Sequence, residues 1–223
     1  MTSSFSDELR DAAAEVWAAQ HQHPFVTGIG DGTLELDRFR HWLRQDYLFL
    51  IDYSRTLALA AARAPDLDTM RRFAELAQAT LGDEMDLHRA YAREFGIAED
   101  ELEREEMAPT TRGYTDFLVR IAAHHDFAEL VGALLPCMWG YSEVGVELAR
   151  GDPPDDGRYA AWIETYSSAE FAELATWCRQ TTDRIGAGLS PEARRRVTDA
   201  FVTSSRYELA FWEMAWTLET WPA

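Results

Sequence analysis

The fold class is decided by residues 36–64, LDRFRHWLRQDYLFLIDYSRTLALAAARA, in which apolar side chains recur with the period of an α-helix. At a rise of about 1.5 Å per residue, this helix spans roughly 43 Å. The same periodicity predicts further helices at 5–20, 67–95, 111–125, 127–150, 157–166, 168–186 and 191–219. No useful stretch shows the two-residue alternation that is typical of a strand. Long helices joined by short loops predict an all-α antiparallel bundle.

The breaks between these helices contain turn residues, as in HPFVTGIGDGTL at 23–34 and GDPPDDG at 151–157. The GIGDG stretch lacks a preceding strand and the spacing of a phosphate-binding loop, so it indicates a turn. No linker rich in Ser and Gly and no internal repeat divides the chain. We therefore predict a single domain over residues 1–223.

The composition argues against several classes of protein. The chain has 21 Lys and Arg against 39 Asp and Glu, for a net charge of −18, which disfavours binding to nucleic acid or to an anionic membrane. No apolar run approaches the roughly 20 residues of a membrane span, and the N-terminus does not resemble a secretory signal. Two cysteines, Cys137 and Cys178, are too few for a disulfide framework. We expect a soluble, cytoplasmic protein with both thiols reduced.

Two carboxylates interrupt apolar helical stripes. Asp46 lies among aromatic residues in 36–64, and Glu208 holds the corresponding kind of position in 191–219. Burying a carboxylate costs several kcal/mol unless it is paired. Each is therefore either a structural acid bonded to a neighbouring helix or a general acid or base of a catalytic site.

A third polar position is Cys137, in the apolar stripe of 127–150, with Tyr141 one turn further on the same face. Pro136 removes a backbone hydrogen bond beside it and weakens the helix there. A lone helical cysteine is either a small core residue or a nucleophile. We interpret Cys178 as a core residue.

Glu84 and His88, four residues apart in 67–95, have the spacing of a metal-ligand pair in a bundle. A di-iron site also needs further carboxylates and Glu-x-x-His motifs, and the sequence contains no such motif. We expect no metal and no cofactor, and we predict that a hydrogen bond between Glu84 and His88 supports a site.

Six blocks of the sequence resemble the TenA family, which comprises thiaminase II and aminopyrimidine aminohydrolase. They occur in the family's order and span nearly the whole chain: HPFVTGIGDGTL (23–34), RQDY (44–47), EMDLH (84–88), ALLPCMWGYSEVG (133–145), WIETY (162–166) and SSRYELAFWEMA (204–215). The PCMWGY and ELAFWEMA stretches are the most specific. The resemblance implies the haem-oxygenase-like helical fold, a homotetramer, and a site that holds an aminopyrimidine without haem or metal.

The resemblance also implies roles for the three polar residues. The family's nucleophile falls on Cys137 and its general acid/base on Glu208. The acid that holds the ring nitrogen and amino group falls on Asp46. Because a free thiol has a pKa of about 8.5, a neighbouring group must favour the thiolate or accept its proton.

The family's site tyrosines fall on Tyr114, Tyr141 and Tyr166. Another aromatic position of the family's site is Phe49 here, where some members have Tyr. We expect stacking on the substrate to survive that change and a hydroxyl hydrogen bond to be lost.

The leading hypothesis is hydrolysis of 4-amino-5-aminomethyl-2-methylpyrimidine to the hydroxymethyl pyrimidine and ammonia, a step of thiamin salvage. Cleavage of thiamin at its methylene bridge would use the same residues, and the sequence does not decide between the two substrates. Two other classes stay open: a pyrimidine-binding or regulatory protein without turnover, and a haem- or iron-dependent oxidase.

Overall fold

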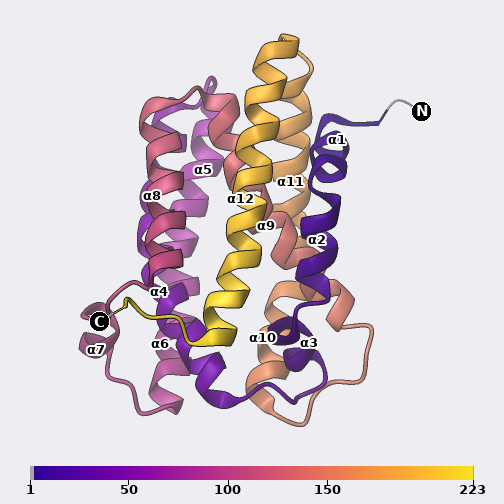
Figure 1. The fold of residues 1–223 in the computed structure, drawn as a ribbon. Coiled ribbons are helices and arrows are strands. Elements are labelled where there is room, and N and C mark those ends of the chain that lie inside the picture. The colour runs from indigo at the N-terminus through magenta and orange to yellow at the C-terminus, as the bar shows by residue number, and fades with distance from the viewer. Residues whose placement is uncertain (1–2, 223) are drawn as a thin grey trace. The chain divides into compact units, whose positions relative to one another are not determined.

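A computed structural model describes residues 3–222, and every regular element in that range is a helix (Figure 1). The all-α prediction is therefore confirmed. The chain forms two compact units. The first comprises the residues up to Glu35 together with Ala128–Glu213, and the second comprises Leu36–Phe127 and the residues from Met214 onward. That both belong to one domain, as the sequence indicates, stays a prediction.

The second unit is built around the long helix α4 (Leu36–Arg63), which the sequence predicts almost to the residue. Its neighbours in the unit are α5 (Leu67–Ala79), η1 (Thr80–Glu84), α6 (Met85–Glu94), α7 (Glu99–Glu103) and α8 (Pro109–His124). Along the inner face of α4, Phe39, Trp42 and Leu57 are at most 1% exposed. Burial of such side chains contributes roughly 1.5–3 kcal/mol each, which fixes the face that α4 turns inward.

The helix predicted over 67–95 is interrupted by η1, a π-helical turn from Thr80 to Glu84. A π turn contains an extra residue, so the side chains of α6 follow a different register from those of α5. Such turns occur frequently at functional sites. Helix α6 ends at Glu94, and Gly96, two residues further on, has a φ of 70°, which suits glycine just after a helix.

The acidic stretch after Gly96 forms the short helix α7. Leu102 on this helix is fully buried and anchors it. Arg44 of α4 binds Glu105 and, at 2.5 Å, Glu101. Part of this acidic stretch therefore has a structural partner.

The first unit contains α1 (Phe5–Ala12), α2 (Ala14–His21), α3 (Pro24–Gly30), α10 (Gly157–Ser167) and α11 (Ala169–Gly186). It also contains α9 (Phe127–Leu148) from Ala128 onward and α12 (Pro191–Thr217) as far as Glu213. The N-terminal helix predicted over 5–20 is in fact two helices, because the backbone at Ala13 leaves helical geometry with φ −110° and ψ 14°.

The prediction of a break at residues 23–34 is wrong for its first half, which forms α3. His23 caps this helix by accepting a hydrogen bond from the Phe25 amide at 3.2 Å, and Pro24 occupies its first position. Proline is favoured there because its missing N–H would be unpaired in any case. Phe25 and Ile29, both fully buried, hold the helix in the core.

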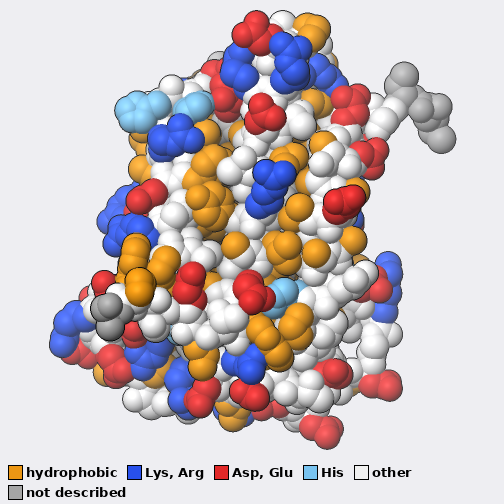
Figure 2. Space-filling view, in the orientation of Figure 1, with side chains coloured by type: hydrophobic (Ala, Val, Ile, Leu, Met, Phe, Trp, Pro, Cys, Tyr) orange, Lys and Arg blue, Asp and Glu red, His pale blue; other side chains and the backbone are white. Residues whose placement is uncertain are grey.

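Acidic side chains are scattered over the visible face and interspersed with Arg (Figure 2). The negative net charge is therefore spread over this face. Within residues 3–222, no helix is both long and apolar enough to cross a bilayer.

Candidate active site

Helix α9 of the first unit carries Cys137, the predicted nucleophile. The residues on either side of it, Pro136 and Met138, are buried, whereas Cys137 itself is partly exposed. The chain stays helical through Pro136, which has no N–H to donate within the helix. The thiol is thus the accessible position on an otherwise buried stretch. Neither Cys137 nor Cys178 forms a disulfide bond.

Two contacts fix the register between α9 and α12. The Ser204 hydroxyl donates a hydrogen bond to the carbonyl of Ala133 at 2.6 Å. Further along, the rings of Tyr141 and Trp212 lie 4.9 Å apart between centroids. Both contacts join residues 71 positions apart, and the later residue on α9 meets the later residue on α12, so the two helices run parallel between these contacts.

That register brings Cys137 and Glu208 to the same level of the helix pair. Each lies one turn after the first contact and one turn before the second, on the helix face that carries both contacts. Glu208 is 2% exposed. The predicted nucleophile and the predicted acid/base are therefore neighbours across α9 and α12.

An aromatic cluster lies beside this pair. The ring centroids of Tyr141 on α9 and Tyr166 on α10 lie 4.9 Å apart. The ring centroid of Trp162 lies 4.6 Å from that of Tyr166 and 6.3 Å from that of Trp212. Gly145 allows α10 to come this close, because a Cβ there would lie 2.5 Å from the Tyr166 carbonyl carbon. The structure therefore brings Tyr141 and Tyr166 together, as predicted. It adds Trp162 and Trp212, which the sequence analysis did not single out although Trp212 lies one turn beyond Glu208.

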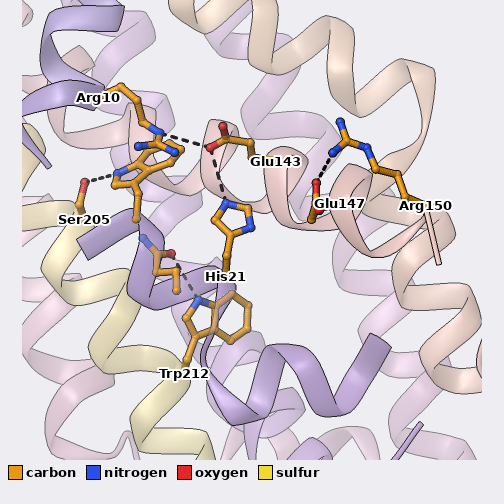
Figure 3. Close-up of polar contacts among 9 residues, drawn as sticks. Arg10, His21, Glu143, Glu147, Arg150, Ser205 and Trp212 are labelled. Atoms are coloured by element: carbon orange, nitrogen blue, oxygen red, sulfur yellow. Dashed lines mark hydrogen bonds and ion pairs between the residues drawn. The ribbon is translucent and has the colours of Figure 1, made fainter. Parts of the chain in front are cut away.

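Side chains of α2 hold α12 on either side of Glu208 (Figure 3). The Trp17 indole N–H donates to the Ser205 hydroxyl at 3.0 Å, and the Trp212 indole N–H donates to Gln20 at 3.3 Å. Ser205 precedes Glu208 by three residues and Trp212 follows it by four. These bonds limit rotation of α12 about its axis and so fix where Glu208 points.

Glu143, two residues after Tyr141 on α9, forms an ion-pair cluster drawn in the same view (Figure 3). Its Oε2 lies 3.4 Å from Arg10 Nε and 3.8 Å from His21 Nε2. Burial opposes ionisation of Glu143, but the His21 hydrogen bond and the Arg10 charge outweigh it and hold the pKa of Glu143 below its ordinary value. The cluster joins α1 and α2 to α9 and supports the helices that carry the cysteine.

The second unit holds Asp46, on α4 and 4% exposed. Its Oδ2 lies 2.7 Å from Nε2 of His88 on α6, and the His88 Nδ1 lies 2.9 Å from the backbone carbonyl oxygen of Glu84. The predicted bond between Glu84 and His88 is therefore found with the backbone carbonyl of Glu84, and the side-chain partner of His88 is Asp46. The sequence showed each residue as a polar member of an apolar stripe but gave no sign that the two helices pair there.

Phe49 and Tyr114 of the second unit are 4% and 1% exposed, and their ring centroids lie 5.0 Å apart. Tyr53, one turn after Phe49 on α4, stacks on it at 5.4 Å. The structure thus brings together the two aromatic residues predicted for this unit and adds Tyr53. Among the side chains that the structure describes, which exclude that of Asp83, no group of three or more His, Cys, Asp and Glu has an arrangement that could hold a metal ion.

The model of the TENA/THI-4/PQQC family matches residues 10–218. The chain belongs to this family. An aminopyrimidine aminohydrolase from Halalkalibacterium halodurans is 45% identical over 220 residues, which cover 98% of this chain and 98% of the relative. The predicted family membership is confirmed.

Solved structures agree with this assignment to the TENA/THI-4/PQQC family. A TenA homologue from P. horikoshii superimposes with a TM-score of 0.89 at 28% identity, covering 96% of this chain and 99% of the homologue. A domain from Shewanella denitrificans with a haem oxygenase-like fold gives a TM-score of 0.72 at 14% identity, covering 95% of this chain and 92% of that domain. The latter likeness concerns the fold alone, and it confirms the predicted haem-oxygenase-like class.

Proposed function

We propose that this chain is an aminopyrimidine aminohydrolase of thiamin salvage, which converts 4-amino-5-aminomethyl-2-methylpyrimidine and water to the 5-hydroxymethyl pyrimidine and ammonia. The observation that carries the proposal is the common level of Cys137 and Glu208 on the parallel helices α9 and α12. A nucleophile needs a neighbouring group that exchanges protons with it and with the leaving group. The full-length relative from H. halodurans supports the substrate class.

Cys137 and Glu208 together supply the nucleophile and every proton transfer that the reaction needs. Glu208 accepts the thiol proton of Cys137 as the sulfur bonds to the electron-poor ring, whose substituent becomes a better leaving group. Glu208 then gives the proton to the departing amine, which leaves as ammonia. Water adds to the exposed methylene and delivers its proton to Glu208. The carbon–sulfur bond then breaks, the aromatic ring reforms, and the proton returns to the thiolate of Cys137.

Substrate binding is assigned to aromatic rings and to one acid. Tyr141 and Tyr166 in the first unit, and Phe49 and Tyr114 in the second, provide faces suited to an electron-poor ring. Asp46 accepts a hydrogen bond from the ring's amino group, as its buried and acceptor-rich carboxylate suits. A structure with a bound pyrimidine tests these contacts directly.

Thiamin hydrolysis is the second activity that we propose. The bond broken there is also at the methylene on the pyrimidine ring, so Cys137 and Glu208 serve without change and only the leaving group differs. Parallel steady-state assays with the two substrates give the ratio of their kcat/KM values, which ranks them.

The test of the proposal is ammonia release by purified protein, with Cys137→Ala as the variant and Cys178→Ala as its matched control. We expect Cys137→Ala to abolish turnover while it still binds the pyrimidine, because it removes the nucleophile and leaves the stacking rings. Cys178, buried on α11, has no part in the reaction, so its variant keeps wild-type turnover. Full activity of Cys137→Ala contradicts the mechanism.

A binding or regulatory protein is the alternative function, and absence of ammonia release from the wild type together with tight pyrimidine binding favours it. From the resemblance we also propose a homotetramer, which light scattering measures. We also propose a cytoplasmic location, because two cysteines in 223 residues are too few for the disulfide framework of a secreted protein.

A further inference from the structure

His88 is held on three sides inside the second unit. It is 1% exposed, its ring centroid lies 5.6 Å from that of Trp42, and its two nitrogens contact different partners. Nδ1 lies 2.9 Å from the carbonyl oxygen of Glu84, and Nε2 lies 2.7 Å from Oδ2 of Asp46. The imidazole therefore bridges the end of η1 on one side and the acid on α4 on the other.

The first of these contacts fixes the proton on one nitrogen. A backbone carbonyl oxygen only accepts hydrogen bonds, so Nδ1 of His88 must carry a hydrogen. An unprotonated Nε2 and an ionised carboxylate oxygen are both acceptors, so their contact at 2.7 Å requires a second proton between Nε2 and Oδ2 of Asp46. The bond from Nδ1 to the Glu84 carbonyl fixes the orientation of the imidazole ring, and this orientation directs Nε2 towards Asp46.

The charges around His88 favour the position of that second proton on its ring. Burial opposes the charged imidazolium, but the hydrogen bond to Asp46 and the negative charges of Asp46 and Glu84 outweigh it, so the pKa of His88 lies above its ordinary value. Nε2–H then donates to Oδ2. Among the described residues, this is the hydrogen bond that the structure gives the Asp46 carboxylate, and it is made through Oδ2 and not through Oδ1.

We propose that His88 is a positioning residue for substrate binding: it holds Oδ2 of Asp46 so that Oδ1 faces the amino group of the aminopyrimidine. This inference rests on the proposed function, which assigns Asp46 to the ring. A buried carboxylate with one oxygen fixed loses little freedom on binding, whereas an untethered one must be ordered by the substrate. His88 acts through Asp46 and does not itself contact the ring.

Two amide substitutions separate the two nitrogens of His88. In His88→Gln, the side-chain N–H reaches the place of Nε2 and still donates to Asp46. In His88→Asn, the shorter side chain replaces Nδ1 and bonds the Glu84 carbonyl but does not reach Asp46. We expect His88→Asn to weaken binding of 4-amino-5-hydroxymethyl-2-methylpyrimidine at least about tenfold and to raise KM more than it lowers kcat, because loss of a hydrogen bond to a charged group changes an equilibrium constant by about tenfold or more. His88→Gln stays several-fold closer to wild type.

The variants are compared in the Asp46→Asn background and with His124→Gln, an exposed histidine on α8 of the same unit. With Asp46 altered, the His88→Asn substitution has no acid left to misplace, so we expect little further loss of binding. His124→Gln leaves binding unchanged. Equal binding by the Gln and Asn variants, or a full additional loss in the Asp46→Asn background, overturns the inference.

A measurement on the wild type keeps the test independent of how the variants fold. In ¹⁵N spectra of the imidazole groups at pH 7, we expect both nitrogens of His88 to carry a proton and the Nε2–H signal to move in Asp46→Asn. An Nε2 without a proton overturns the inference. Ammonia release separates failure of the proposed function from failure of the inference about His88. A wild type that is inactive on aminopyrimidines refutes the proposed function. An active wild type with an unaffected His88→Asn variant refutes the inference about His88 alone.

Discussion

Replacing Glu84 by Gln should stabilise the protein, and by an amount that grows with pH. Burial, together with the charge of Asp46, outweighs the attraction of His88 and raises the pKa of Glu84 from 4.5 to about 7. A carboxyl group whose pKa is higher in the folded state favours folding while it is neutral. Its ionisation penalty is therefore negligible below the unfolded value and complete once the pH has risen past about 7.

The magnitude follows from the two pKa values. One pKa unit corresponds to about 1.4 kcal/mol, so the interval from 4.5 to about 7 gives a full penalty of about 3 kcal/mol at pH 8. At pH 5 the same relation leaves about 1 kcal/mol. Because Glu84 is only half-buried, water screening makes these figures upper bounds. Gln is neutral at every pH and avoids the penalty.

The assay is urea unfolding followed by tryptophan fluorescence at several pH values between 5 and 8.5. We expect the difference in the free energy of unfolding between Glu84→Gln and wild type to rise across this interval. Glu103→Gln, an exposed residue on α7 of the same unit, is the matched control and should change stability by less than about 0.5 kcal/mol throughout. A Glu84→Gln effect that is constant with pH, or that falls as the pH rises, refutes the reasoning.

Three further substitutions test other parts of the structure. Asp46→Asn should raise KM for the aminopyrimidine at least about tenfold and lower kcat less, as measured by ammonia release; an unchanged KM contradicts its assignment to the ring. Ser204→Ala leaves a buried carbonyl on α9 without its donor and should lower the free energy of unfolding by about 1–3 kcal/mol, measured in urea, and a neutral effect counts against the α9–α12 contact. Gly145→Ala forces a Cβ against the backbone of Tyr166 and should lower the free energy of unfolding by about 1–3 kcal/mol. In Gly157→Ala the new Cβ meets no atom within 4 Å, so stability should not change; equal melting temperatures for the two variants contradict this prediction.

The long helices were predictable because their buried residues are apolar and recur in the sequence with the period of an α-helix. The prediction for 36–64 matches α4, whose apolar stripe is interrupted only by Asp46 and ends before Pro65. The same logic failed at α3, where Pro24 and the following glycines suggested a turn. Proline disrupts the interior of a helix but not its first position, so the decisive information was the exact place of Pro24 relative to His23.

Burial of the site residues was also predictable, but their partners were not. Asp46 and Glu208 were singled out as carboxylates in apolar stripes, and the structure buries both. That His88 meets Asp46, 42 residues away, depends on how α4 and α6 are set against each other after the π turn at η1. An extra residue in a helical turn rotates every later side chain of the helix about the helix axis, and the local sequence pattern does not indicate where such a residue occurs.

The two buried acids differ in what surrounds them, and this difference supports their separate assignments. Asp46 is tethered through one oxygen to a histidine that is itself fixed by a backbone carbonyl. A carboxylate held in this way is suited to accepting a hydrogen bond in one place, which is what a binding residue does. Glu208 instead lies at the level of a partly exposed thiol, on a helix whose rotation is fixed by Trp17 and Gln20. A group that must take a proton from sulfur and give it to a leaving amine needs a fixed position next to the nucleophile, and the register of α9 and α12 provides it.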